Sequence, residues 1–266
     1  MSATLPQPGL SRLRSAIAKL DIALPAPGGD LGQDQEYVVV HLPDGWKKIR
    51  LHDYDEVFQV PGLYERWVYD ILGCQSPTVV ASLLKRCLES AGVRPDSITV
   101  LDLGAGNGYV ANEFRKLGIR RAVGVDIHPE AAMAAERDRP GLYADYVVGD
   151  LTDLPRDQGD VLDSHAFNAM ACVAALGFGD IPPAVFAEAY NRVDNAGWIA
   201  FTIKTDFTEG KDPSGFAGLI RSMLDDGSLD LARRETFTHR RSTDGQPLLY
   251  DAFIGRKRAD ITVPKG

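Results

Sequence analysis

The sequence is poor in cysteine and has no apolar run long enough to cross a membrane. Its three cysteines, Cys74, Cys87 and Cys172, lie far apart and form no CxxC pair, so they cannot by themselves build a structural zinc site. Their odd number is typical of reduced thiols inside a cell. No stretch approaches the roughly 18 apolar residues of a membrane span, and the N-terminus lacks the features of a signal peptide. We therefore expect a cytoplasmic protein with no membrane partner.

Basic residues are also scarce. The chain has 29 Lys and Arg against 37 Asp and Glu, a formal net charge of −8. A surface that binds nucleic acid through phosphates needs clustered Lys and Arg, and the clusters here, such as residues 240–241 and 256–258, are short. The composition therefore argues against a nucleic-acid partner.

The 266 residues suffice for one α/β domain and an extension. Residues 1–55 are predicted to form an N-terminal extension: a short helix capped by Ser11, a Pro/Gly linker at 25–29, and a hairpin over 37–51 that turns at Pro43-Asp44-Gly45. An isolated hairpin is marginal in water, so it should pack on the main domain or on a second subunit, as a homodimer through the extension. The main domain spans residues 56–258, and 259–266 form a tail.

The main domain alternates strand and helix patterns after a helical segment at 54–89 that is broken at Ser76-Pro77. Strands are expected at 99–103, 122–125, 144–148, 167–172 and 198–203, helices at 109–117, 129–138 and 184–192, and a closing strand pair at 233–241 and 248–256. This alternation predicts an α/β fold with a mostly parallel sheet covered by helices on both faces. The closing pair adds an antiparallel strand.

The most informative segment is VLDLGAGNG at 100–108, where a buried strand runs into a glycine turn and then a helix. Such a turn lets a ligand approach the backbone closely. Dinucleotide enzymes use G-x-G-x-x-G, but after Gly104 and Gly106 the third glycine position holds Tyr109. Asp102, two residues before Gly104, is expected to face the ligand crevice, where it would repel a pyrophosphate and attract an ammonium group.

Two further acids follow the next two strands. Asp126 can accept both hydroxyls of a ribose, and Asp150 can accept the exocyclic amine of an adenine, with Ile127 and Leu151 against the ring. We also place Ala105 of the glycine turn against the cofactor. An acid at a strand end is often only a turn former or helix cap, but three in register after successive strands favour a nucleoside-containing cofactor.

The series VLDLGAGNG, VGVDIHPEA, VVGDLTDLP and NAGWIAFTI resembles the ordered motifs of class I S-adenosylmethionine (SAM)-dependent methyltransferases over roughly residues 60–258. The resemblance implies a Rossmann-like, seven-stranded sheet whose last strand is antiparallel. It also implies that Gly104 and Gly106 contact the methionine end of SAM, Asp126 the ribose, and Asp150 with Leu151 the adenine. Residues 167–183 and 239–257 are similar to small methyltransferase-like proteins of the Williams–Beuren region type, which leaves the acceptor open.

Candidates for catalysis are fewer. Lys204 follows the fifth strand and His239 lies in the sixth, so either is a possible base, although a solvated Lys and a hydrogen-bonded strand His are the commoner outcomes. Val173 after the fourth strand is placed against the cofactor. The segment 180–183 (DIPP) departs from the Asp-Pro-Pro-aromatic signature of amino-directed methyltransferases and is typical of a helix start. Lid or substrate contacts are expected from three aromatic residues, Tyr64, Trp67 and Phe178.

The leading hypothesis is a SAM-dependent methyltransferase acting on a small molecule. Three alternatives remain: a SAM-binding partner protein without activity, a protein-directed methyltransferase that recruits its target through the extension, and an NAD-linked oxidoreductase. The sequence shows no metal constellation, and we expect no metal cofactor.

Overall fold

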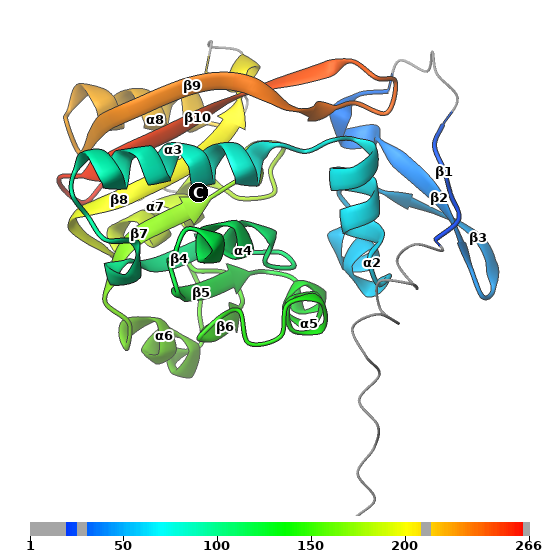
Figure 1. Ribbon diagram of the computed structural model, residues 1–266, viewed down its shortest axis with the longest axis horizontal. Helices are drawn as coiled ribbons and strands as arrows, with labels where there is room; N and C mark the ends of the chain where they lie inside the picture. The colour runs from blue at the N-terminus through cyan, green and yellow to red at the C-terminus, as the bar shows by residue number, and fades with distance from the viewer. Residues whose placement is uncertain (1–19, 26–30, 209–213, 263–266) are drawn as a thin grey trace, which may run out of the picture.

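The computed structural model describes residues 20–25, 31–208 and 214–262 (Figure 1). The helix predicted after Ser11 and most of the Pro/Gly linker lie outside these residues. Two sheets organise the described chain: a three-stranded sheet in the N-terminal extension and a seven-stranded sheet in the main domain. Within the described part of the chain, no helix is long and apolar enough to span a membrane.

The seven-stranded sheet has the order β6-β5-β4-β7-β8-β10-β9. Only β10 runs antiparallel to its neighbours β8 and β9, and the pairs among β4 to β8 are parallel. The strands are β4 (Thr99–Leu103), β5 (Arg121–Asp126), β6 (Asp145–Val148), β7 (Phe167–Cys172), β8 (Val193–Lys204), β9 (Leu229–Arg241) and β10 (Pro247–Lys257). The predicted mostly parallel, seven-stranded sheet with one antiparallel C-terminal strand is confirmed.

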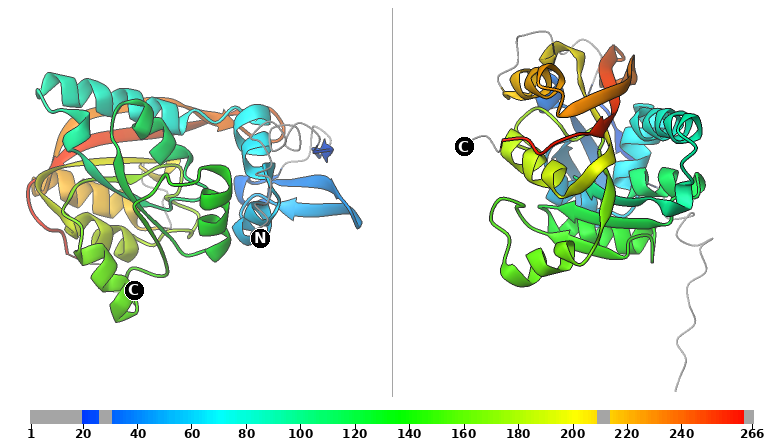
Figure 2. Two further views of the ribbon diagram at one scale, coloured as in Figure 1. Left: turned by 60° about the horizontal axis from the view of Figure 1, so that its bottom comes forward. Right: turned by 90° about the vertical axis from the view of Figure 1, so that its left-hand side faces the viewer.

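Helices cover both faces of this sheet (Figure 2). On one face, α3 (Ser76–Ser90) and α4 (Tyr109–Lys116) pack against alternate strand residues such as Val100 and Ala200. On the other face, α6 (Arg156–Asp163), α7 (Pro183–Asn191) and α8 (Phe216–Asp225) pack against residues such as Leu101 and Phe201. α5 (Pro129–Asp138) follows β5 and contacts the extension's helix α2 (Tyr54–Gln59). The sequence did not predict α6 or α8.

The extension contains the predicted hairpin, formed by β2 (Tyr37–Leu42) and β3 (Gly45–Arg50), with β1 (Ile22–Ala23) added at its edge. Next come α2 and a π-helix, η2 (Glu65–Ile71). Residues as far as Cys74 share one apolar cluster with the hairpin, so we count them with the extension from here on, beyond the predicted boundary at residue 55. Short 3₁₀ turns lie at η1 (Gln33–Gln35), η3 (Pro95–Ser97) and η4 (Thr205–Phe207).

The extension packs on the same chain, beside the β9–β10 turn (Figure 1). Glu36, which is fully buried, accepts hydrogen bonds from Nη2 of Arg240 at 2.5 Å and from the backbone N–H of Thr243 at 2.6 Å. The hairpin was predicted to pack either on the main domain or on a second subunit. In the structure the segment that leads into it packs on the main domain.

Candidate active site

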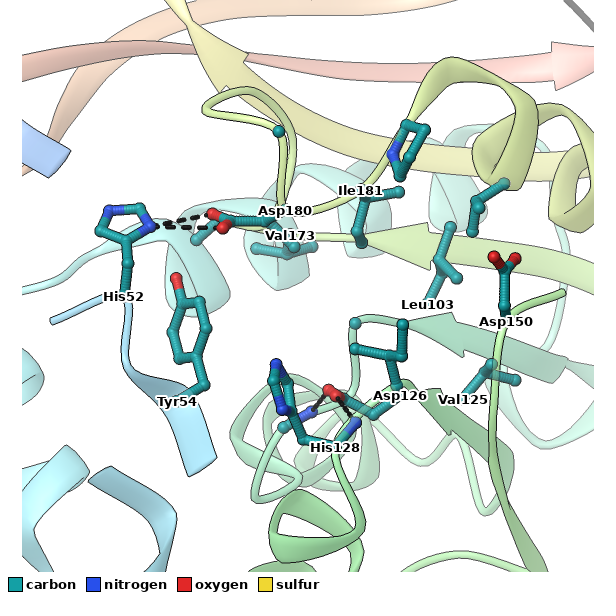
Figure 3. A pocket seen from close by; sticks show the side chains of 18 of the residues that line it. His52, Tyr54, Leu103, Val125, Asp126, His128, Asp150, Val173, Asp180 and Ile181 are labelled. Atoms are coloured by element: carbon teal, nitrogen blue, oxygen red, sulfur yellow. Dashed lines mark hydrogen bonds and ion pairs between the residues drawn. The ribbon is translucent and has the colours of Figure 1, made fainter. Parts of the chain in front are cut away.

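A pocket of about 300 Å³ opens at the carboxyl ends of four parallel strands (Figure 3). Leu103 ends β4, Asp126 ends β5, Asp150 lies two residues after β6, and Val173 directly follows β7. The chain passes from β4 to β5 on one side and later adds β7 on the other, so the pocket lies at a switch point of the sheet, where α/β folds bind their ligands.

The glycine turn forms the floor of the pocket. Gly104 and Gly106 have positive φ angles of 67° and 52°, which side chains rarely allow. A Cβ atom on Gly104 would lie 2.9 Å from both Ala175 Cβ and Ile181 Cδ1, and one on Gly106 would lie 3.2 Å from Phe58 Cζ. Glycine is therefore required by the backbone conformation and by close neighbours on both sides of the turn.

The amides of this turn are already hydrogen-bonded within the protein. The N–H groups of Gly104 and Ala105 donate to the carbonyl of Val125 at 2.9 and 3.1 Å, and that of Gly106 donates to Oδ2 of Asp126 at 2.9 Å. A pyrophosphate in a Rossmann turn needs free amides, and these three are occupied. The geometry therefore disfavours a dinucleotide.

Asp126 lies at the centre of the pocket (Figure 3). Besides the Gly106 amide, its carboxylate accepts the backbone N–H of His128 at 3.0 Å through Oδ1. These bonds fix the side chain, and because each carboxylate oxygen has two acceptor positions, both oxygens retain capacity for ligand hydroxyls. Burial raises the pKa of Asp126.

Asp150 lies farther along the same pocket. Its Oδ1 accepts the backbone N–H and the hydroxyl of Thr152 at 2.9 and 2.7 Å, so it also shapes the turn after β6. Ile127 is 59% exposed and lines the pocket. The structure thus brings together in one pocket six of the predicted cofactor residues, whose contact with a cofactor stays a prediction: Gly104, Gly106, Asp126, Ile127, Asp150 and Val173.

Three predicted cofactor residues do not line this pocket. The expectation that Asp102 faces the crevice is wrong: it is 1% exposed and accepts a hydrogen bond from the Tyr143 hydroxyl at 2.7 Å. Successive strand residues point to opposite faces of a sheet, so Leu103 faces the pocket and Asp102 faces away. Ala105 and Leu151 are buried in the structure at 4% and 5% exposure.

The two predicted catalytic residues also lie off the pocket wall. His239 is 4% exposed, its Nδ1 lies 2.7 Å from Oγ of Ser76, and its ring packs on Tyr250 at a centroid distance of 4.1 Å. Burial holds the pKa of His239 well below its usual range. Lys204 forms an ion pair with Asp206 at 2.9 Å. His239 is thus a hydrogen-bonded strand histidine, whereas Lys204 is ion-paired and partly buried, not solvated.

Of the three aromatic residues predicted to contact the ligand as a lid, one lines the pocket and two do not. Tyr64 lines the pocket, whereas Trp67 is fully buried in the core of the extension. Phe178 packs edge-on against His52 and Phe207, at centroid distances of 5.5 and 5.1 Å. It therefore supports the wall from behind.

Sequence reasoning missed one side of the site. His52, Tyr54 and Phe58 belong to the extension and its first helix, yet they line the pocket with Asp180 from the loop after β7 (Figure 3). The predicted boundary at residue 55 divides this wall. The sequence pattern places Asp180 near the start of a helix. The polar and aromatic residues at 52–54 (His-Asp-Tyr) were the one feature of the sequence that could have indicated this wall of the pocket.

The loop after β7 has an unusual backbone. Ala174 and Phe178 have positive φ angles of 60° and 55°, and Gly177 and Gly179 have 97° and 86°. Non-glycine residues in this region cost about 1–3 kcal/mol each and cluster at functional sites. A hydrogen bond from the Ala174 N–H to Oγ1 of Thr202 at 2.7 Å holds the start of the loop.

Comparisons with known proteins agree with this geometry. Residues 101–201 match the family described as a methyltransferase domain. A ubiquinone biosynthesis O-methyltransferase of Xanthomonas axonopodis pv. citri is 25% identical over 61% of this chain and 64% of its own length. A ribosomal protein L11 methyltransferase of Geobacter metallireducens is 38% identical over 26% of this chain and 24% of its own length. The chain thus spans less than two thirds of these relatives.

Among solved structures, the N-methyltransferase NodS of Bradyrhizobium japonicum, in complex with S-adenosylhomocysteine (SAH), superimposes with a TM-score of 0.51. The match covers 78% of this chain and 98% of NodS at 15% identity, which establishes a shared fold. The comparisons and the strand order lead to one conclusion: residues 101–201 match a methyltransferase domain, and the chain has the fold of class I SAM-dependent methyltransferases.

Proposed function

We propose that the protein transfers a methyl group from SAM to a small-molecule acceptor. The observation that carries this proposal is the glycine turn whose amides are satisfied by Val125 and Asp126. In such a turn the backbone allows close approach of a ligand, while the amides of Gly104, Ala105 and Gly106 are not available to a pyrophosphate, which supports SAM over a dinucleotide.

The residues of the pocket fit SAM in chemistry. Asp126 would accept the ribose hydroxyls, Asp150 would accept the adenine amine, and Ile127 and Val173 would contact the adenosine. Gly104 and Gly106 line the pocket with their backbone, and we place the methionine end of SAM against them. Bound SAM supplies an already activated methyl group, so the chain's main task is to position the acceptor.

The acceptor side favours a small molecule. Residues of the extension, His52, Tyr54 and Phe58, enclose the pocket opposite the loop after β7. The net charge of −8 disfavours a phosphate-rich target. A protein acceptor is the second candidate, because 71 residues are 38% identical to the L11 methyltransferase. The cytoplasmic location and a homodimer stay predictions.

Transfer of label from methyl-labelled SAM separates these candidates. The acceptors are a panel of small phenols, amines, carboxylic acids and thiols, and in parallel purified ribosomal protein L11. We expect label in the small-molecule fraction. Label only in L11 would favour the protein-directed enzyme, and SAH binding without transfer to any acceptor would favour the inactive partner protein.

A further inference from the structure

A histidine and an aspartate meet at the acceptor end of the pocket. His52 follows β3 in the extension and Asp180 lies in the loop after β7, yet Nδ1 of His52 is 3.0 Å from Oδ2 and 3.4 Å from Oδ1 of Asp180 (Figure 3). Their side chains are 16% and 26% exposed, and both residues line the pocket. The pair is therefore partly shielded and within reach of a bound ligand.

The imidazole is held in place by its neighbours. Tyr54 and Phe178 pack edge-on against it at centroid distances of 5.6 and 5.5 Å. With Nδ1–H donating to the Asp180 carboxylate, Nε2 carries the lone pair, and it has no hydrogen-bond partner among the residues that the structure describes. A His oriented by a carboxylate in this way is the arrangement of a general base.

The other charged and titratable groups around this pair come from several elements. Arg240, His239 and Tyr250 line a small cavity beside His52 and Asp180, and Asp126, His128 and Asp150 line the main pocket with them. Asp53, next in sequence, is bonded to the guanidinium of Arg50 at 2.6 and 3.1 Å. Tyr54 is the other titratable group in ring contact, and burial raises its pKa well above the usual value. Asp180 is thus the carboxylate placed to stabilise a protonated His52.

The walls around the pair suit a flat ring. On one side Tyr54 and Phe58 stack with an interplanar angle of 21°, and Tyr64 adjoins Phe58 at 5.1 Å. On the other side are the apolar side chains of Ala175 and Ile181. The glycine turn lies between these walls, since a Cβ on Gly104 would meet Ala175 and one on Gly106 would meet Phe58.

We propose that His52, oriented by Asp180, is the general base for methylation of an aromatic hydroxyl. This inference rests on the proposed methyltransferase function. The acceptor oxygen gives its proton to Nε2 of His52 and forms the new O–C bond as the methyl C–S bond breaks. The bonding pair stays on sulfur, and the imidazolium pairs with the Asp180 carboxylate. His52 is the catalytic residue and Asp180 is a positioning residue.

The first test compares His52→Gln, Asp180→Asn and His41→Gln. His41 is the matched control, because it is an exposed histidine on β2 that packs on Trp46, away from the pocket. With labelled SAM and catechol as the acceptor, His52→Gln should lower kcat by about 100-fold to 10,000-fold, the range of general-base catalysis. Asp180→Asn should lower it less and shift the acid limb of the pH–rate profile, and His41→Gln should match the wild type.

A second readout needs no turnover. 4-Nitrophenol bound beside SAH should ionise more readily in the wild type than in His52→Gln, which visible absorbance of the phenolate reports. SAH affinity should be equal in all four proteins. Equal kcat and equal nitrophenol ionisation in His52→Gln would overturn the inference, as would methylation confined to thiols or amines. Failure of the wild type to bind SAH would instead overturn the proposed function.

Discussion

The hydroxyl of Tyr143 lies 2.7 Å from Oδ2 of Asp102, beneath the glycine turn and away from the ligand pocket. Asp102 is 1% exposed, and burial, partly offset by the Tyr143 hydrogen bond, raises its pKa to about 7. A Cβ on Gly108 would lie 3.1 Å from the Tyr143 ring. This pair therefore helps to fix the turn from the side opposite the pocket.

The raised pKa of Asp102 predicts a pH-dependent stability. The folded state holds this proton more tightly than the unfolded state, whose pKa is near 3.8. The stabilisation is thus complete at low pH and is lost as the pH rises to about 7. Relative to Asp102→Asn, the wild type should lose up to about 1.4 kcal/mol for each pH unit of this rise. Urea unfolding of both proteins at about pH 5 and pH 8 measures this, and parallel pH profiles would contradict it.

Asp126 should carry much of the affinity for the cofactor. We expect Asp126→Ala to weaken SAH binding by about 1–3 kcal/mol, because the ribose hydroxyls lose a charged acceptor. Asp145→Ala is the matched control, since this exposed aspartate on β6 pairs with His165 at 2.8 Å outside the pocket. Calorimetry with SAH measures both. Unchanged affinity in Asp126→Ala would show that the ribose site is misplaced.

The glycine turn should not tolerate a methyl group. Gly104→Ala places its Cβ 2.9 Å from Ala175 and Ile181 at a φ of 67°, so thermal stability and SAH affinity should both fall. Gly159→Ala is the control: Gly159 lies in α6, and nothing lies within 4 Å of its Cβ position. That change should stabilise the protein by about 0.5–1 kcal/mol. Equal melting temperatures for the two variants would refute this role of the turn.

The buried ion pair between Glu36 and Arg240 should be essential for docking the extension. Arg240→Met leaves the Glu36 carboxylate buried without its cation and should cost about 3–5 kcal/mol of the free energy of unfolding. Arg94→Met is the control, because the Arg94–Asp96 pair is exposed and such pairs contribute little. Denaturant unfolding compares them, and a double variant, Glu36→Leu with Arg240→Met, should recover part of the loss. Similar costs for the two single variants would rule out this role.

The parts of the fold that the sequence predicted are those with local signals. β4 and β7 and helix α5 have the predicted bounds, because apolar runs and flanking turn residues mark them. α6 was missed because it is largely polar and buries one residue, Leu162.

The parts of the site that the sequence did not predict depend on distant contacts. Asp126 and Asp150 could be placed because parallel strands end at one edge of a sheet. His52 and Asp180 are 128 residues apart in the sequence. A periodic pattern in the sequence reveals only local structure, so it could not predict their contact. The burial of His239 depends on Ser76 in α3. The orientation of Asp102, by contrast, followed from the alternation of strand side chains and could have been predicted.

Calorimetric titration of the full chain with SAH, run beside NADH, tests most directly whether this pocket binds SAM. We predict micromolar binding of SAH and none of NADH. Binding of NADH in preference, or no binding of SAH, would contradict the assignment of the pocket.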